Sequence, residues 1–383
     1  VIATIATHLT ELTTQPHSTP LTHHPQLLQV ALTTGYTANT LHDPYSAIAL
    51  APYLDLTEQV FGPEHPNTLA SRNNLAYAYG SAGDLGRAIP LYEQSLADMK
   101  RILGPDHPTT LTSRNNLAYA YKDAGNLDRA IQLYEQNLTD TERVLGPDHP
   151  DTFTGRNNLA GAYKAAGSFD QVIPLFEQNL ADMEHVLGAD HPNTLTSRNN
   201  LADAYMSAGN LDQAIHLYER TLTDRQRVLG PDHPDTLSSR SSLASAFVTA
   251  ENLDTGIPLL ERTLADRERV LGSDHPSTLI SRNNLASAYR DAGDFDRAIA
   301  LHEQNLTDSE RVLGPDHPRT LASRNNLAVA HVHAGDFDQA ISLFEQTLAD
   351  RERVLGPDHP DTISSRDDLA IARGADGDVG PST

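Results

Sequence analysis

Histidine is the side chain of this sequence best suited to bind a metal ion or to transfer a proton near neutral pH. Eight of the eighteen histidines recur at one position, between an acidic residue and a proline. They are His65, His107, His149, His191, His233, His275, His317 and His359. Neighbouring helices pack about 10 Å apart, whereas metal ligands lie about 2 Å from their ion, so histidines on successive helical units cannot share one. We therefore predict a turn residue at a helix entrance in each case, and no metal site.

The other residue types that could perform catalysis also recur with the repeat. The sequence has no phosphate-binding G-x-x-x-x-G-K-[ST] loop, no G-x-S-x-G nucleophile elbow and no H-E-x-x-H zinc motif. Its carboxylates repeat along the chain and converge on no unique pocket. Because catalysis usually needs one singular constellation, we predict a protein that is not an enzyme, with no catalytic residue and no cofactor.

Composition limits the partners further. The formal net charge of −23 at pH 7 argues against nucleic acid, because phosphate binding needs a concentrated basic face. No apolar run approaches the roughly 18 residues of a membrane span, and residues 1–7 are too short and threonine-rich for a signal peptide. The chain has no cysteine, which excludes disulfides and thiolate metal sites. We expect a cytoplasmic protein without a nucleic acid or membrane partner.

These residues belong to a repeat that organises the whole chain. The glycine that opens the repeat recurs every 42 residues without insertion or deletion, at Gly62, Gly104, Gly146, Gly188, Gly230, Gly272, Gly314 and Gly356. A fixed period of this length indicates a solenoid of stacked supersecondary units. The absence of an initiator Met and an end halfway through a repeat suggest a piece of a longer protein.

Each copy reads as two helices. In the copy from Gly104, Pro108 starts the first helix, which carries one apolar stripe at helical spacing to Tyr121. Gly125 ends this helix, and Asn126 caps a second one, whose stripe begins at Leu127. Pairs of antiparallel helices stacked side by side predict an all-α solenoid.

The order Leu117-Ala118-x-x-Tyr121 followed by Ala130-x-x-x-Tyr134 resembles the core of the tetratricopeptide repeat. With the N-N-L-A-x-x-Y core and the G-x-D-H-P linker, the chain is similar to the 42-residue repeats of kinesin light chains and their bacterial relatives. The resemblance implies a right-handed superhelix whose first helices line the concave surface. We predict a leader over residues 1–25, a degenerate capping repeat over 26–61, seven repeats over 62–355, a half repeat over 356–373 and a disordered tail over 374–383.

One arginine recurs on the packing stripe of the first helix, where the shorter repeat commonly has tryptophan. The arginines to which we assign a structural role are Arg72, Arg114, Arg156, Arg198, Arg282 and Arg324, and Arg240 and Arg366 are their counterparts in the other copies. An unpaired charge there would be costly. We expect each guanidinium to bind a polar residue of the second helix, such as Ser95 or Asn137, or a glutamate such as Glu135. The alternative is an arginine that points to solvent at the edge of the stripe.

The face beside the first-helix stripe carries asparagines that recur and neighbours that change chemical class between copies. The resemblance implies that Asn and Arg of the first helices line a groove for a cargo peptide, with asparagine amides binding its backbone. The predicted peptide-binding residues are Asn73, Tyr77, Asn115, Tyr119, Lys122, Asn157, Lys164, Asn199, Asp203, Asn283, Arg290 and Asn325. The alternative is that the variable positions are solvated and drift without a function.

These observations predict an interaction scaffold that binds a peptide or protein segment on its concave face. The resemblance is compatible with the sensor arm of a larger signalling protein. The alternative is a structural spacer or a self-assembling repeat array, since near-identical repeats can stack between molecules; we expect a monomer. The fifth copy departs most, with Ser241-Ser242, Glu251 and Gly256, and we predict that the array is locally weakest there.

Overall fold

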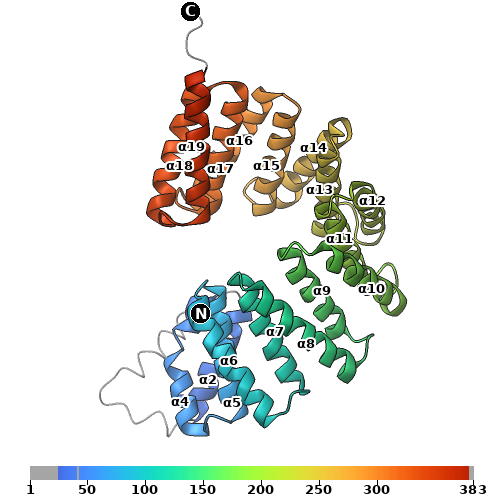
Figure 1. The fold of residues 1–383 in the computed structure, drawn as a ribbon, viewed down its shortest axis with the longest axis vertical. Helices are drawn as coiled ribbons and strands as arrows, with labels where there is room; N and C mark the ends of the chain where they lie inside the picture. The colour runs from blue at the N-terminus through green and yellow to red at the C-terminus, as the bar shows by residue number, and fades with distance from the viewer. Residues whose placement is uncertain (1–24, 41–42, 379–383) are drawn as a thin grey trace, which may run out of the picture. The chain divides into compact units, whose positions relative to one another are not determined.

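The computed structural model describes residues 25–40 and 43–378, and every secondary-structure element in these ranges is a helix, numbered α2 to α19. The predicted leader over residues 1–25 lies almost entirely outside the described residues. Contacts divide the chain into two units, Val1–Ser197 and Arg198–Thr383. Figure 1 shows the helices of both units in chain order.

Seven helical hairpins and one further helix follow the N-terminal region. The first helices are α5 (Pro66–Ser81), α7 (Pro108–Asp123), α9 (Pro150–Ala165), α11 (Pro192–Ser207), α13 (Pro234–Thr249), α15 (Pro276–Asp291), α17 (Pro318–Ala334) and α19 (Pro360–Asp378). The second helices are α6 (Leu85–Ile102), α8 (Leu127–Leu145), α10 (Phe169–Leu187), α12 (Leu211–Val228), α14 (Leu253–Leu271), α16 (Phe295–Leu313) and α18 (Phe337–Val354). The all-α solenoid of stacked hairpins is confirmed.

The linker residues explain why the helices begin and end where they do. His107 is the N-cap of α7, and its Nδ1 accepts a hydrogen bond from the backbone N–H of Thr109 at 3.2 Å. Gly125 adopts φ +76° after α7, a conformation that costs glycine little. Asn126 then caps α8 by accepting from the N–H of Arg129. The histidine is therefore the N-cap at the helix entrance, where the sequence predicted a turn residue.

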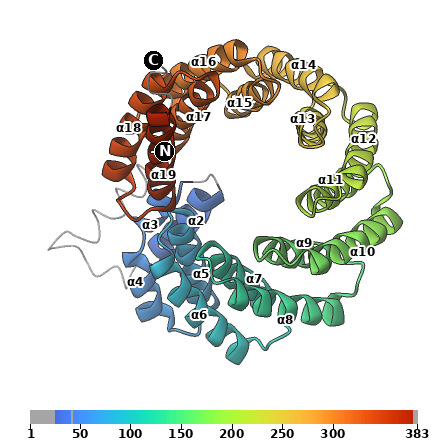
Figure 2. The ribbon, with the colours of Figure 1, turned by 45° about the horizontal axis from the view of Figure 1, so that its top comes forward.

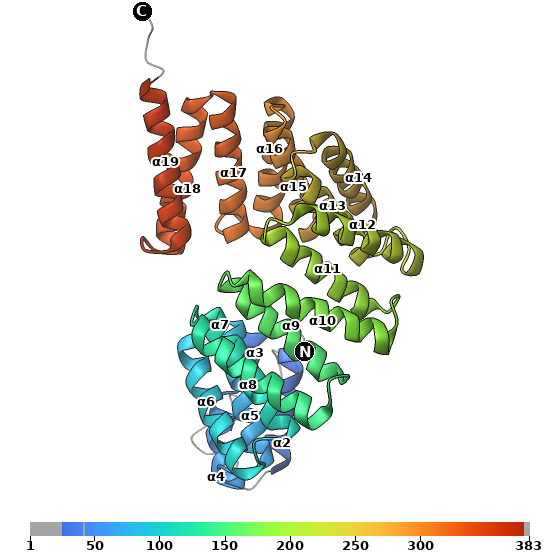
Figure 3. The same cartoon turned by 45° about the vertical axis from the view of Figure 1, so that its right-hand side comes forward.

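Within each unit the first and second helices form separate layers. In the first unit α5, α7 and α9 lie on the inner, concave side and α6, α8 and α10 on the outer side (Figure 2). In the second unit α13, α15 and α17 lie inside and α14, α16 and α18 outside, and α15 to α19 stand side by side (Figures 2 and 3). We call the surface of α5, α7 and α9 the first-helix face of the first unit.

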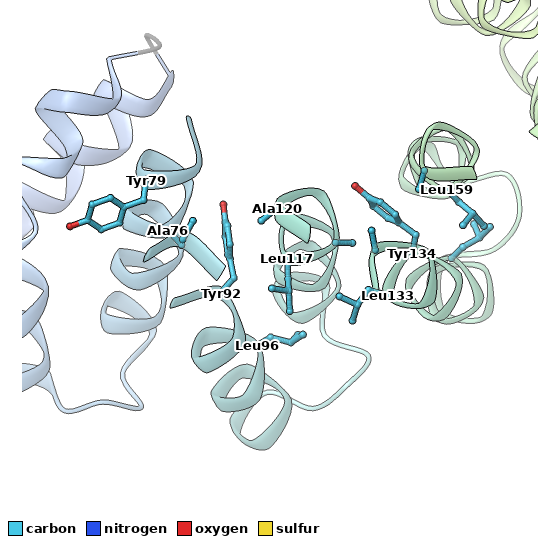
Figure 4. Close-up of a cluster of buried hydrophobic side chains, with 14 of the residues drawn as sticks. Ala76, Tyr79, Tyr92, Leu96, Leu117, Ala120, Leu133, Tyr134 and Leu159 are labelled. Carbon is cyan, nitrogen blue, oxygen red and sulfur yellow. The ribbon is translucent and has the colours of Figure 1, made fainter. Parts of the chain in front are cut away.

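Apolar side chains of both layers meet between the hairpins. Leu117 and Ala120 of α7 pack with Leu96 of α6 and Leu133 of α8, all of them buried (Figure 4). The rings of Tyr92 and of its counterpart in α8 lie between successive first helices and point their hydroxyl groups toward the first-helix side (Figure 4). Because no hairpin could bury this surface alone, the stacking itself creates the core.

The repeated arginines of the seven hairpins are buried, and each pairs with an aspartate that was not predicted. Arg114 is 0% exposed, and its Nη1 lies 2.7 Å from Oδ2 of Asp140. The same pair, with the aspartate 26 residues after the arginine, spans 2.5–2.8 Å in all seven hairpins. The pairs are Arg72–Asp98, Arg114–Asp140, Arg156–Asp182, Arg198–Asp224, Arg240–Asp266, Arg282–Asp308 and Arg324–Asp350. These charge-assisted bonds join the two helices of each hairpin.

Ser95, Asn137 and Glu135 do not bind the guanidinium, although other glutamates do, as in the pair of Arg156 with Glu142 at 2.9 Å. Glu135 instead accepts a hydrogen bond from the hydroxyl of Tyr163 in the next hairpin, and Ser95 donates to a backbone carbonyl. The aspartate lies one turn beyond the predicted polar position, where the arginine stem reaches it. The solvent-facing alternative is also wrong for the seven hairpins, although Arg366 in α19 has a side chain 49% exposed.

Both ends of the described chain and the fifth copy differ from a uniform array. The region predicted as one degenerate repeat over 26–61 contains α2 (Pro25–Thr40), α3 (Pro44–Ile48) and α4 (Pro52–Phe61), since each proline favours a new helix start. At the other end α19 continues past Arg373 to Asp378. The rest of the predicted tail, residues 379–383, lies outside the described residues.

The fifth copy keeps its hairpin despite its substitutions. Glu251 takes the place of the turn glycine with φ +59°, the one non-glycine residue with positive φ among the described positions. At Gly256 an added Cβ would lie 2.7 Å from Cγ2 of Val248. Helix α14 therefore approaches α13 more closely than an alanine would allow without adjustment.

Candidate functional site

A cavity of about 500 Å³ opens on the first-helix face of the first unit. Its lining includes Tyr77 of α5 and Asn115 and Tyr119 of α7, three residues predicted to bind a peptide. These side chains come from two consecutive first helices. Asn115 and Tyr119 are four residues apart on α7 and therefore lie on one face of that helix. The structure thus brings together polar amide and aromatic groups from neighbouring repeats.

The two tyrosines are exposed, unlike the core tyrosines. Tyr77 is 41% exposed and Tyr119 is 52% exposed. The ammonium group of Lys122 lies 4.6 Å from the centre of the Tyr119 ring, in a cation–π arrangement. The negative charge of Asp123 raises the pKa of Tyr119, so its hydroxyl stays protonated and can donate or accept a hydrogen bond.

Asn115 is held in place by the next repeat. Its Oδ1 accepts a hydrogen bond from Nδ2 of Asn158 in α9 at 2.9 Å. Asn326 binds Asn283 in the same way at 2.8 Å, so in these two repeats the second asparagine of the Asn-Asn pair joins neighbouring first helices. The NH₂ group of Asn115 has no hydrogen-bond partner among the residues described, so it remains able to donate to a ligand.

The other predicted residues of the first unit do not line this cavity. Asn157 accepts from Nδ2 of Asn179 at 3.1 Å, and Oδ1 of Asn73 is buried without a partner in the described part of the chain. Lys164 is half-buried on α9, and the ring beside Lys122 has no counterpart there because Gly161 replaces Tyr119.

In the second unit most predicted residues bind one another or their neighbours. Asp203 accepts hydrogen bonds from the hydroxyl of Tyr218 and, at 3.3 Å, from Nδ2 of Asn199. Asn325 donates to Oδ2 of Asp368 at 3.1 Å. Nη2 of Arg290 lies 2.8 Å from Oδ1 of Asp291. These contacts occupy groups that a ligand would otherwise use.

The cavity lining also includes residues that were not predicted to bind a ligand, among them Tyr92, Asp123 and Asn158. Tyr92 comes from the second helix, where its helical position indicates only the core, so no sequence signal marks it as lining the cavity. Burial raises the pKa of Tyr92 well above its usual range. Asp123 and Asn158 also line the cavity. The invariance of the Asn-Asn pair between most copies was the available signal for Asn158.

Other kinds of site find little support in the geometry. Three or more His, Asp or Glu side chains do not gather into a metal-binding group within the described ranges. Among the helices described, none combines the length and apolar character needed to span a membrane.

Comparison with known proteins decides the family. Family models of the tetratricopeptide repeat match residues 68–109, 110–151, 152–193 and 194–235 in one form, and 241–307, 281–352 and 328–379 in another. The chain belongs to the tetratricopeptide repeat family. Tetratricopeptide repeat proteins are generally protein-interaction scaffolds, and their fold is typically not enzymatic.

Several solved structures are similar to this chain. A kinesin light chain-like protein with nearly identical repeats from Podosopora anserina is 33% identical, covers 54% of this chain and 97% of its own, and has a TM-score of 0.49. The apo quorum sensor NprR from B. thuringiensis is 13% identical, covers 85% of this chain and 87% of its own, and has a TM-score of 0.58.

A signal transduction ATPase with a tetratricopeptide repeat sensor from Pyrococcus horikoshii is 12% identical, with a TM-score of 0.53, over 87% of this chain and 50% of its own. The last two likenesses show the fold alone. A search of curated proteins found no match.

Proposed function

We propose that this tetratricopeptide repeat protein binds an extended peptide or protein segment on the first-helix face of the first unit. The observation that carries the proposal is the cavity of about 500 Å³ in which Tyr77, Asn115 and Tyr119 converge from two repeats. Exposed aromatic rings beside amide groups are typical of peptide-recognition surfaces, because rings supply contact area and amides bind the backbone.

Each residue has a chemical role in this proposal. The rings of Tyr77 and Tyr119 pack against an apolar ligand side chain. The NH₂ group of Asn115 donates to a ligand carbonyl, while its bond to Asn158 fixes the orientation of the amide. Lys122 and Asp123 supply one charge of each sign at the rim.

The remaining predicted residues extend the surface with a smaller contribution. In the first unit these are Asn73, Asn157 and Lys164. In the second unit they are Asn199, Asp203, Asn283, Arg290 and Asn325. Because several of their polar groups already have protein partners, we expect the affinity to come chiefly from the Tyr77–Tyr119 cavity.

The proposal extends to a role as the sensor arm of a larger signalling protein. Two structural neighbours are a quorum sensor and a sensor-bearing signal transduction ATPase. These likenesses support the fold, and the signalling role itself is our inference. A cytoplasmic location and a monomeric state remain predictions.

The test is a screen of a random decapeptide library against the full chain, followed by titration of the selected peptides. Tyr77→Ala combined with Tyr119→Ala is expected to weaken binding at least tenfold. Tyr45→Ala is the matched control, because Tyr45 is 73% exposed and does not line the cavity. Peptides that bind the double variant as tightly as the original chain would contradict the proposal, and so would a library without any binder.

A further inference from the structure

One buried position of the second helix changes size along the chain. Its residues are Met99, Thr141, Met183, Arg225, Arg267, Ser309 and Arg351. The methionines are 1% and 5% exposed and the arginines 5–7%, so long side chains fill this place in five hairpins. The two hairpins with a small residue each have a cavity there, of about 180 Å³ near Thr141 and about 170 Å³ near Ser309.

Arg267 shows how the protein binds a guanidinium at this place. Its Nη1 donates to the backbone oxygen of Ser277 at 3.1 Å and to Oγ of Ser281 at 2.6 Å. Its Nη2 donates to Oγ of Ser238 at 3.2 Å. The group therefore lies between α13 and α15, on the inner side of its own hairpin, and is bound by neutral oxygen atoms. Arg351 makes the matching bonds to Asp361 O and Ser365 Oγ.

The Thr141 cavity offers corresponding acceptors without the arginine. Thr112 stands where Ser238 stands, and Asp151 stands where Ser277 stands; both line the cavity. Gly155 replaces the third acceptor and leaves more room. Asn137, 6% exposed, also lines the cavity, and its Oδ1 has no partner among the described residues. Such a buried oxygen is costly unless a donor reaches it.

We propose that the Thr141 cavity receives an arginine side chain of the peptide partner, whose guanidinium takes the place that Arg267 fills in its own hairpin. The inference rests on the proposed function, since Asn115 lines both this cavity and the tyrosine cavity. The guanidinium donates to the backbone oxygen of Asp151, to Thr112 Oγ1 and to Asn137 Oδ1. The methylenes of the arginine pack on Leu111 and Leu145 at the apolar wall.

Charge distinguishes this cavity from its counterpart. The Asp151 carboxylate stands at the rim, with a side chain 71% exposed, and the whole chain carries a net charge of −23. Arg319 occupies the matching place at the Ser309 cavity and repels a second cation. The invariant Arg114 does not exclude a guanidinium, because Arg267 coexists with its counterpart Arg240.

The first test follows threonine methyl NMR signals of the full chain during titration with N-acetyl-arginine methylamide. The Thr112 and Thr141 signals are expected to shift to saturation, and the uncharged N-acetyl-citrulline methylamide is expected to bind at least tenfold more weakly. Thr141→Met, which copies Met99, and Thr141→Arg, which copies Arg267, each remove the response. Ser309→Met is the matched control and leaves it unchanged.

Two results would overturn the inference: equal shifts with the citrulline probe, or an unchanged Kd in both Thr141 variants whose spectra show a folded chain. Library peptides separate this from the proposed function. If selected peptides lose nothing when their arginines become citrulline, the cavity assignment fails while groove binding stands. If no peptide binds but the arginine probe saturates the Thr141 signals, the cavity stands and the proposed function fails.

Discussion

Lys100 interrupts a pattern of ion pairs that supports the buried arginines. Arginines in several hairpins receive a second carboxylate, 14 residues earlier in the chain. The pairs are Arg72–Glu58 at 3.1 Å, Arg156–Glu142 at 2.9 Å, Arg282–Glu268 at 2.9 Å and Arg324–Glu310 at 3.3 Å. For Arg114 this position is Lys100, and Nε and Nη2 of Arg114 have no partner within the described part of the chain.

We predict that Lys100→Glu stabilises the protein by about 1–2 kcal/mol. A hydrogen bond to a charged group stabilises the folded protein by about 1.5–3 kcal/mol. A carboxylate in the last turn of a helix destabilises it by about 0.3–1 kcal/mol, because it lies at the negative end of the helix dipole. Glu58 and Glu142 are 36% and 38% exposed in the matching pairs, so solvent screening favours the lower end of the gain.

The assay is equilibrium urea unfolding, with amide hydrogen exchange in α7 as a local readout. Lys100→Gln is the control, because it removes the like charge without adding a carboxylate. Gln226→Glu should act in the same direction, since it supplies the missing partner of Arg240, whose Nη2 is also unpaired among the described residues. A Lys100→Glu variant no more stable than Lys100→Gln would refute the reasoning.

The pH dependence gives an independent check. Burial and the nearby Arg114 lower the pKa of Lys100 from its ordinary 10.5. The unfolded chain therefore holds this proton more tightly than the folded chain, and the original protein gains stability as the pH rises through the folded pKa toward 10.5. This gain should be absent in Lys100→Gln.

Three further predictions concern the core and the turns. Glu251→Gly should stabilise by about 1 kcal/mol, because glycine adopts φ +59° without the penalty of a side chain, and thermal unfolding measures it. Burial lowers the pKa of His302 from 6.5 to about 4, with the charge of Arg290 adding to the effect. Stability should therefore fall by about 3 kcal/mol as the pH drops from 6.5 to 4, and His302→Phe should remove this loss in urea titrations across that range. Asp140→Ala should cost about 3 kcal/mol in urea unfolding, because Asp140 is the one carboxylate on its buried arginine among the described residues. Asp182→Ala should cost less, because Asp182 shares its arginine with a glutamate; equal costs would contradict this.

The repeat period and the helix-end residues were enough to predict the hairpins. Local chemistry determines where the helices begin and end, through the proline after histidine, Gly125 and the Asn126 cap. The helix ends can therefore be predicted from a single copy of the repeat. The partner of Arg114 could not be predicted in this way, because helical periodicity shows which side of its helix a residue faces and not which residue it meets on another helix. The signal was present nonetheless, since Asp140 has a counterpart in every hairpin.

The candidate site was predictable in part. Asn115 and Tyr119 share one face of the first helix of their copy, and Tyr77 is the counterpart of Tyr119 in the preceding copy. The structure places all three around one cavity. The Thr141 cavity depends on the volume of one buried side chain relative to its counterparts, which becomes meaningful only when the hairpins are stacked. The internal bonds of Asp203 and Asn325 likewise depend on contacts between elements.

Hydrogen–deuterium exchange of the full chain with a library-selected peptide tests the central claim most directly. The account predicts slower exchange in α5 and α7 around Tyr77 and Tyr119, with α6 and α8 unchanged on their outer side. Protection confined to the second helices, or no change in either layer at saturating peptide, would contradict it.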